Sequence, residues 1–205
     1  MLAVLPLSSL VVYALLMHRR GWSPRSAMLA AAVLWAVTLT AMTELLSFFR
    51  ALSPGSLAGA WGVVLVCTIA AWLSARQPSR SGTERQERQV GIRKPVRLPP
   101  KEATCVVGIG LILSGTLLTA LVAAPNNWDS MTYHMARVAH WSQNQSVAHY
   151  PTSIPRQLYL GPGAEFVILH FQILTGGDRL ANVIQWLSAP GHKYGDVFSG
   201  DYRSP

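Results

Sequence analysis

The residues best suited to chemistry lie in one polar run that follows an apolar stretch ending at Ala123. The run covers residues 127–137 and has the carboxylate of Asp129 close to its start. A carboxylate placed where a membrane helix emerges into water is able to act on a substrate held at the membrane surface. The role of Asp129 therefore depends on the elements that position it and on the side of the membrane that it faces.

The composition is typical of a membrane protein. Of 205 residues, 50% are hydrophobic and 13% are charged, whereas soluble domains carry about 25% charged residues. The formal net charge is +8, but the basic residues gather beside apolar runs, which is a topology signal, so we predict no nucleic-acid partner. Cys67 and Cys105 lie within apolar runs and predict neither a disulfide framework nor a zinc site.

Four apolar runs approach the length of about 20 residues that a helix needs to cross the bilayer core. They cover residues 2–17, 27–49, 57–75 and 103–123. The first lacks a basic amino-terminal region and a small-residue cleavage site, so we interpret it as a span and not as a signal peptide. The predicted fold is all-α: a polytopic helical membrane protein with about four transmembrane helices and an extracytoplasmic segment with interfacial helices.

Lysines and arginines indicate the orientation, because strongly basic loops stay in the cytoplasm. Residues 18–26 hold three arginines and residues 76–101 are rich in arginine and lysine, whereas the connection between the second and third runs holds only Arg50. We therefore predict a multi-pass protein of the plasma (inner) membrane with residues 124–163 extracytoplasmic. Glu44, near the outer end of the second run, is a functional candidate unless it only reaches interfacial water.

The chain divides into four predicted regions. Residues 1–75 are amino-terminal transmembrane helices, and residues 76–102 are a basic cytoplasmic linker rich in Ser, Gln, Glu and Pro. Residues 103–188 hold the fourth span, the polar run, a loop and two short helices. Residues 189–205 are polar and without periodicity, and we expect this tail to replace what a longer membrane protein would carry, as in a truncated chain.

The polar run has the pattern of a helix lying on the membrane surface. Asn127 or Asp129 is suited to cap a helix over residues 130–143. Asp129, Tyr133, Arg137 and His140 share one stripe of that helix if it is regular. A separate apolar face is formed, by three- and four-residue spacing, by Met131, Met135, Val138 and Trp141.

Two further elements follow the surface helix. Residues 144–163 form a loop with several prolines, which favour extended backbone before them, and this loop holds His149 and Arg156. Residues 164–174 then predict a short apolar helix that opens at Glu165 and ends at Gly176. A second short helix is expected over residues 179–188, and neither is long enough to span a bilayer.

At these residues the chain resembles the GT-C superfamily of membrane glycosyltransferases, which use lipid-linked sugar donors, and in particular its protein-mannosyltransferase-like branch (family 39) and related bacterial enzymes. The resemblance covers residues 103–188. Its motifs are Trp128-Asp129-Ser130-Met131-Thr132-Tyr133-His134, His149-Tyr150-Pro151-Thr152 and Gly176-Gly177-Asp178-Arg179. In that superfamily the first extracytoplasmic loop carries an acidic residue and a helix along the membrane. Two departures are the Ser130 that follows Asp129, where many members have a second acid, and the larger number of spans in the superfamily.

The resemblance implies transfer of a sugar from a polyprenyl-phosphate donor to an acceptor on the extracytoplasmic side, by the amino-terminal part of such an enzyme. In this hypothesis Asp129 is the catalytic base that takes the proton of the acceptor hydroxyl. Arg137 or Arg156 holds the donor phosphate, because a guanidinium forks onto phosphate oxygens. The predicted substrate-binding residues are Tyr133, His134, Arg137, His149 and Arg156. Membrane lipid and the lipid-linked sugar are the expected partners; no cofactor is predicted, and divalent metal is unsupported because no ligand set has a familiar spacing.

Each assignment has a plainer alternative. Asp129 also fits a simple helix cap, and Arg137 fits a side chain that reaches up to lipid head groups. The histidines fit solvated interfacial residues, and Glu165 fits stabilisation of a helix terminus better than a second catalytic acid. For the whole chain, the alternatives to an enzyme are a non-catalytic membrane subunit that binds a lipid or a protein, and an inactive truncated remnant.

Overall fold

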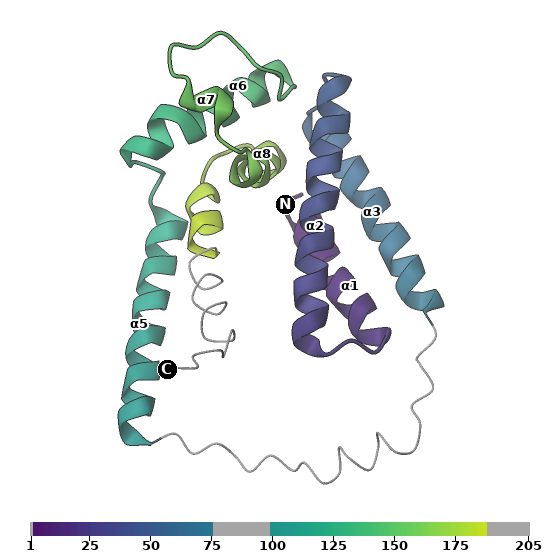
Figure 1. The fold of residues 1–205 in the computed structure, drawn as a ribbon, viewed down its shortest axis with the longest axis vertical. Coiled ribbons are helices and arrows are strands. Elements are labelled where there is room, and N and C mark those ends of the chain that lie inside the picture. Colours follow the sequence, from purple (N-terminus) through teal and green to yellow (C-terminus); the bar gives the residue numbers. More distant parts are fainter. Residues whose placement is uncertain (1, 76–98, 188–205) are drawn as a thin grey trace, which may run out of the picture.

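The computed structural model describes residues 2–75 and 99–187, and over these ranges the chain is helical with no strand (Figure 1). The predicted all-α class is confirmed. The predicted tail, residues 189–205, lies outside the described residues. So does the predicted linker, apart from residues 99–102, which lead into a helix.

Three helices are long and apolar enough to cross a membrane: α2 (Pro24–Phe48), α3 (Pro54–Ser74) and α5 (Pro100–Val122). The shortest has 21 residues, or about 31 Å at 1.5 Å per residue. Each starts at a proline, whose fixed φ suits the first helical turn. The protein is therefore membrane-embedded, with helix bounds within a few residues of those predicted.

The first apolar run forms α1 (Val4–Arg19), which has 16 residues and is shorter than the other three. It packs against both α2 and α3. The indole N–H of Trp35 in α2 donates to the carbonyl of Pro6 at 2.7 Å, and the Tyr13 hydroxyl lies 3.1 Å from Thr38 Oγ1. The predicted group of about four membrane helices thus consists of three spanning helices and one shorter apolar helix.

The polar run after α5 is less regular than predicted. It begins with a π-helical turn, η1 (Ser130–His134), and continues as α6 (Met135–Asn144). Asn127 makes the cap: its Oδ1 accepts from the Ser130 amide at 2.7 Å. The Asp129 side chain makes no capping bond, so the plain helix-cap alternative for Asp129 is wrong. Single π-helical turns are frequent at functional sites.

The apolar face of α6 packs on protein and not on lipid. Val138 and Trp141 are buried against α8 (Gly163–Thr175), whereas Met131, expected on the same face, is 60% exposed. The π-helical turn accounts for the difference, because it changes the angular spacing between residues before and after Met135. The expectation of one continuous apolar stripe resting on the membrane is therefore wrong.

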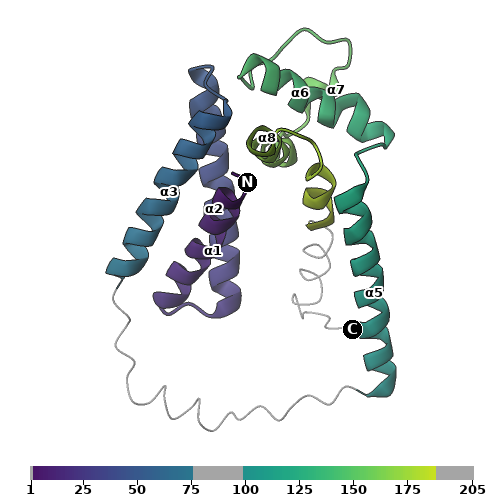
Figure 2. The same ribbon diagram turned by 180° about the vertical axis from the view of Figure 1, so that it is seen from behind.

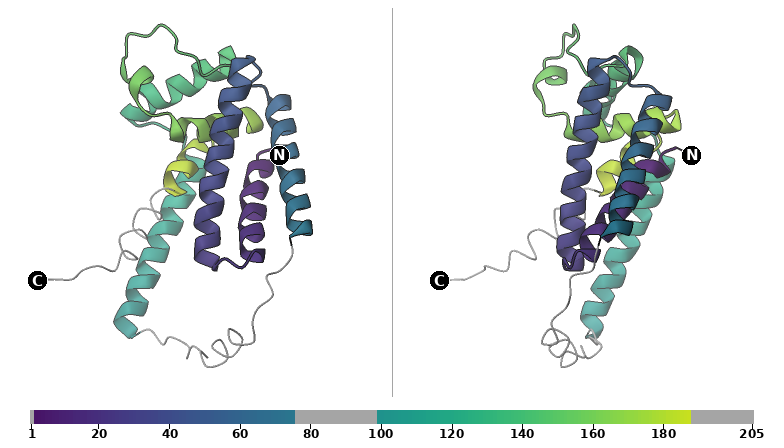
Figure 3. Two further views of the ribbon diagram at one scale, coloured as in Figure 1. Left: turned by 45° about the vertical axis from the view of Figure 1, so that its right-hand side comes forward. Right: turned by 90° about the vertical axis from the view of Figure 1, so that its right-hand side faces the viewer.

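Helix α8 lies crosswise to the spans, beneath α6, as Figure 1 and Figure 3 show from different sides. It is short, as predicted, and ends at Gly176 with a left-handed φ of 75°. Most of its side chains are buried. They form the main hydrophobic core with α6 and with residues of α2 and α3 such as Leu39, Leu57 and Trp61.

Two sets of hydrogen bonds tie α8 and the segment after it to the spans. His170 of α8 is fully buried between Trp61 and Thr43, with heavy-atom distances of 3.0 and 2.8 Å. The helical residues 181–187 run beside α5 (Figure 2). There the Asn182 amide donates to the carbonyl of Ala123 at 2.8 Å and the Trp186 indole donates to Thr116 at 3.0 Å. These bonds hold the segment after α5 against α2 and α3 on one side and against α5 itself on the other.

Candidate functional site

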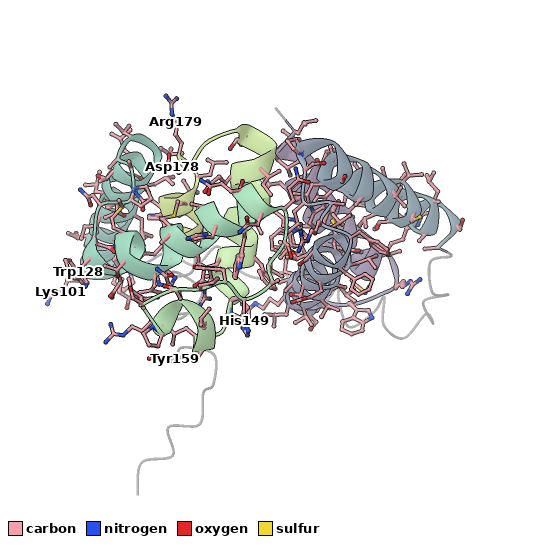
Figure 4. The ribbon with its side chains drawn as sticks, turned by 90° about the horizontal axis from the view of Figure 1, so that it is seen from above. Lys101, Trp128, His149, Tyr159, Asp178 and Arg179 are labelled. Carbon is pink, nitrogen blue, oxygen red and sulfur yellow. The ribbon has the colours of Figure 1, made fainter. Side chains whose placement is uncertain are left out.

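Four of the six predicted site residues line two clefts on either side of α6, whereas Tyr133 and Arg156 line neither. The first, named here the α5 cleft, has a volume of about 630 Å³ and is lined by Asp129 and His134 among others. The second, the α2 cleft, has a volume of about 1050 Å³ and is lined by Arg137 and His149 among others. Seen from above, His149 lies on the side of the loop that faces α2, and Trp128 lies well away from it (Figure 4).

The α5 cleft has both polar and apolar walls. Its polar lining comprises Asn127, Asp129, Ser130, His134, Asn182 and Gln185. Its apolar lining comprises Pro125, Trp128, Met135, Ala164, Ile168, Ala181 and Ile184. These residues come from the segment between α5 and η1, from η1 and the start of α6, from α8 and from the helical residues 181–187. The cleft therefore opens where a spanning helix ends, which suits a ligand that is part lipid and part polar.

A buried carboxylate lies behind His134. Glu165, in the first turn of α8, is 1% exposed. Its Oε1 lies 2.8 Å from Nδ1 of His134 and 3.2 Å from Nη1 of Arg137. A buried carboxylate must be paired and hydrogen-bonded to remain charged, and these two donors meet that need. For Glu165, stabilisation of a helix terminus was favoured over the role of a second catalytic acid; in the structure its side chain connects α8 with η1 and α6.

The contact with Glu165 determines which ring nitrogen of His134 carries the proton and which is open to a ligand. An ionised carboxylate only accepts hydrogen bonds, so Nδ1 of His134 carries the proton between them. In the described part of the chain, no partner contacts Nε2 of His134. A carboxylate that holds one ring nitrogen sets the tautomer and the orientation of the ring. The other nitrogen of His134 is then available to a ligand in the α5 cleft.

Arg137 organises the loop that follows α6. Its side chain is 1% exposed, so the alternative that it reaches lipid head groups is wrong. Its guanidinium donates to the carbonyls of Arg156, Gln157 and Leu160 at 2.9, 2.8 and 3.1 Å, in addition to Glu165. All three guanidinium nitrogens are engaged. Arg137 therefore shapes the wall of the α2 cleft.

Gln157 joins the same loop to η1. Its Oε1 accepts from the hydroxyls of Tyr150 and Thr152 at 3.0 and 2.8 Å, and its Nε2 donates to the carbonyl of Thr132 at 2.7 Å. Burial raises the pKa of the Tyr150 phenol above its ordinary 10.0, and the positive charge of Arg137 opposes this in part. The prolines in this segment predicted an ordered loop, but nothing in the sequence pointed to Gln157 as its centre.

The remaining predicted residues are placed as follows. Tyr133 is half-buried, and its ring lies against that of His134 with centroids 4.0 Å apart. Asp129 is exposed in the α5 cleft. His149 is exposed in the α2 cleft, and Arg156 is exposed and lines neither of these clefts. The structure thus gathers Asp129, Tyr133 and His134 on one side of the loop and leaves the other predicted residues elsewhere.

Among residues 2–75 and 99–187, no group of three or more His, Cys, Asp or Glu side chains has a geometry that would hold a metal ion. Asp129 and the oriented imidazole of His134 give the α5 cleft two groups that are suited to acid–base chemistry. A single acidic residue at the start of an otherwise apolar helix was the sequence signal that could have identified Glu165 as the partner of His134.

Comparisons with known proteins find no family model, no curated protein and no solved structure that matches the chain. The likeness to GT-C glycosyltransferases therefore rests on the three sequence motifs.

Proposed function

We propose that the chain acts in glycosyl transfer from a polyprenyl-phosphate donor to an acceptor hydroxyl, with the α5 cleft as the reaction centre. The observation that supports this proposal is that Asp129 and the Glu165-oriented imidazole of His134 line one cleft at the end of a spanning helix. A base and a second proton-handling group beside apolar lining residues suit transfer from a lipid-linked donor.

The walls of the α5 cleft suit an amphiphilic donor. Trp128, which is largely exposed, and Ile184 offer apolar surface at the end of α5. Ser130 and Asn182, which also line the cleft, offer hydrogen-bonding groups for a sugar or a phosphate. A polyprenyl tail would remain in the hydrocarbon beside α5 while its head group enters the cleft.

The proposed reaction is a displacement at the anomeric carbon. The acceptor oxygen forms a bond to that carbon, and the bond from the carbon to the phosphate oxygen breaks, with its electron pair leaving on the polyprenyl phosphate. Asp129 takes the hydroxyl proton in the transition state, a contribution of about 10²–10⁴-fold to the rate. Nε2 of His134, when protonated, donates a hydrogen bond to the departing phosphate oxygen.

The donor phosphate is assigned to His134 in preference to an arginine. All three guanidinium nitrogens of Arg137 are already bonded within the protein, and Arg156 lines neither cleft. Tyr133 supports His134 through its ring contact. The exposed His149 and Arg156 are left for parts of a substrate that extend beyond the reaction centre.

The proposed location is the outer face of the plasma membrane. The turn between α1 and α2, the end of α3 and the start of α5 lie at one end of the molecule, and the segment with η1, α6 and α7 (Arg156–Tyr159) lies at the other (Figure 1). The first end has Arg19, Arg20, Arg25 and Lys101. Basic ends face the cytoplasm, which would put the α5 cleft outside.

A non-catalytic subunit is the second candidate. One observation favours it: the buried polar side chains of Arg137 in α6 and Gln157 in the loop make their hydrogen bonds within the protein. A loop of this kind is suited to present a fixed surface to a lipid or to another membrane protein. If the chain is such a subunit, the α5 cleft binds the lipid-linked sugar and does not catalyse its transfer.

The test uses membranes that contain the chain and a radiolabelled polyprenyl-phosphate hexose, with donor binding and hexose transfer measured separately. For the enzyme, Asp129→Asn lowers transfer by about 10²–10⁴-fold and leaves donor binding unchanged. The matched control is Glu102→Gln, at an exposed acid that lines neither cleft. Binding that depends on His134 without any transfer supports the subunit, and a chain that does not bind the donor contradicts both candidates.

A further inference from the structure

Two opposite charges that the proposed reaction does not use share the wall of the α2 cleft. Glu44 lies one turn before the end of α2, and Arg50 lies just beyond that end. Both side chains are exposed, and within the described ranges neither makes an ion pair or a side-chain hydrogen bond. An ionisable residue this close to the membrane is a functional candidate, and here it faces a cavity of about 1050 Å³.

The cleft that holds these charges is built before any ligand arrives. Ser47 of α2 lies 3.1 Å from the Ser146 hydroxyl and accepts from the Val147 amide at 2.8 Å, which fastens the end of α2 to the loop. Arg137 and Gln157, which also line the cleft, hold the loop through the bonds described above. A ligand that enters the α2 cleft therefore does not have to order its walls, which favours binding.

Arg50 occupies a backbone position that favours glycine. Its φ of 49° is left-handed, as at the residue that follows many helices. It is also the only basic residue between α2 and α3. An arginine at this position presents a cation to the α2 cleft, which the exposed imidazole of His149 also lines.

The rim of the cleft is apolar and aromatic. Phe48 is 82% exposed, and Leu158 and Tyr159 are also exposed while lining the cleft. Phe48 is the last residue of a spanning helix, and aromatic side chains concentrate at the lipid–water boundary. The α2 cleft therefore opens at the level of lipid head groups, so its occupant is expected to come from the bilayer.

We propose that the α2 cleft is a binding site for a zwitterionic phospholipid whose head group has a primary ammonium, namely phosphatidylethanolamine. The Glu44 carboxylate accepts hydrogen bonds from the ammonium, Arg50 and His149 donate to the phosphate, and the acyl chains lie against Phe48 and Leu158. A quaternary ammonium has no N–H to donate, and an anionic head group without an ammonium would meet the Glu44 charge unpaired. This site is separate from the α5 cleft and does not depend on the proposed reaction.

The experiment measures lipid retention by the purified chain in detergent, by native mass spectrometry, with equimolar dioleoyl phosphatidylethanolamine, phosphatidylcholine and phosphatidylglycerol. The unchanged chain retains phosphatidylethanolamine above the other two. Glu44→Gln removes that preference: retention of phosphatidylethanolamine relative to the other two lipids falls by about tenfold, the factor that one charge-assisted hydrogen bond supplies. Glu44→Lys reverses it in favour of phosphatidylglycerol. Arg50→Gln lowers retention of all three, because each has the phosphate.

The matched controls are Glu102→Gln and Arg20→Gln, which change exposed side chains that line neither cleft. Both should leave the preference for phosphatidylethanolamine intact. Circular dichroism shows whether each variant keeps its helices, and a variant that loses them is replaced by Glu44→Ala or Arg50→Lys. Equal retention of the three lipids by the unchanged chain, or a preference that persists in both Glu44 variants, overturns the proposal.

Discussion

His134 and Glu165 are in direct contact: Nδ1 of His134 lies 2.8 Å from Oε1 of Glu165, although 31 residues separate them in the sequence. The contact joins the π-helical turn after α5 to the first turn of α8. It also couples the two clefts, because the same carboxylate oxygen accepts from Arg137, which lines the α2 cleft. A change at Glu165 is therefore expected to affect both sides of α6.

Glu165 is expected to set the tautomer of His134. With ¹⁵N-labelled histidine, the Nδ1 resonance of His134 should be that of a protonated nitrogen, because the carboxylate can only accept. Glu165→Gln should abolish this preference, since an amide both donates and accepts. His134→Gln assigns the resonance, and His149→Gln is the control that leaves it in place. A protonated Nδ1 that survives Glu165→Gln would show that the carboxylate does not position the ring.

Arg137 is expected to hold the loop of residues 145–162. Arg137→Lys keeps the charge but loses the fork that reaches three carbonyls, and it should lower stability by about 3 kcal/mol, as expected when a buried pair is disrupted. Chymotrypsin should then cut after Tyr159 faster than in the unchanged chain. Arg156→Lys, at an exposed guanidinium, is the matched control. Equal cleavage of the two variants contradicts the role of Arg137.

His170 is expected to be neutral, with its proton on Nε2. The Trp61 indole can only donate, so Nδ1 of His170 accepts; Thr43 donates its own proton to Leu39, so it accepts from Nε2. His170→Leu leaves the buried Trp61 N–H without a partner, at a cost of about 1–3 kcal/mol. Denaturant unfolding in micelles measures the loss.

A double-mutant cycle separates this hydrogen bond from packing. Adding Trp61→Phe to His170→Leu removes the orphaned N–H, so the two changes together should cost less than the sum of the single changes. Strict additivity would mean that Trp61 and His170 contribute to stability only through the space they fill.

Tyr150 is expected to make stability depend on pH in the alkaline range. Burial raises its pKa above 10.0, so the folded state favours the neutral phenol that donates to Gln157. This contribution is fully present below pH 10, the unfolded value, and is lost as the pH rises through the higher folded pKa. The free energy of unfolding, measured at a series of pH values, should fall in this range. In Tyr150→Phe the part of that fall that comes from the phenol should be absent.

At neutral pH, Tyr150→Phe is expected to cost about 1 kcal/mol, the usual contribution of one hydrogen bond. Tyr159→Phe is the matched control, because that side chain is largely exposed. An alkaline profile that is the same for Tyr150→Phe and for the unchanged chain would show that the phenol of Tyr150 is not responsible.

The helices themselves could be predicted from the sequence. Long apolar runs set α2, α3 and α5, and Gly176 marked the end of α8 within one residue. These predictions succeed because bilayer length and helix termination depend on residues that are neighbours in the chain. The same local reasoning failed at η1, where one π-helical turn changes which side chains share a face and moves Met131 away from Val138.

The sequence identified several residues of the site, but it did not show which of them lie together. Asp129, His134 and Arg137 were identified by their types, but nothing in their spacing showed that His134 faces one cleft and Arg137 the other. Glu165 and Gln157 received little or no weight, because the bonds that join them to η1 and α6 connect residues 20 to 31 positions apart in the chain. Hydrogen bonds over such separations depend on how α8 packs beneath α6.

The sequence by itself determined that this is a helical membrane protein with a polar, chemically capable segment after Ala123, because hydrophobic length and local capping act over a few residues. The tertiary structure alone decided which charges are buried and which remain open to a ligand. Glu165 and Arg137 are enclosed together, whereas Asp129, Glu44 and Arg50 stay exposed in clefts. Burial depends on the crosswise packing of α8 against α2, α3 and α6, since that contact removes water from one set of charges and leaves the other solvated.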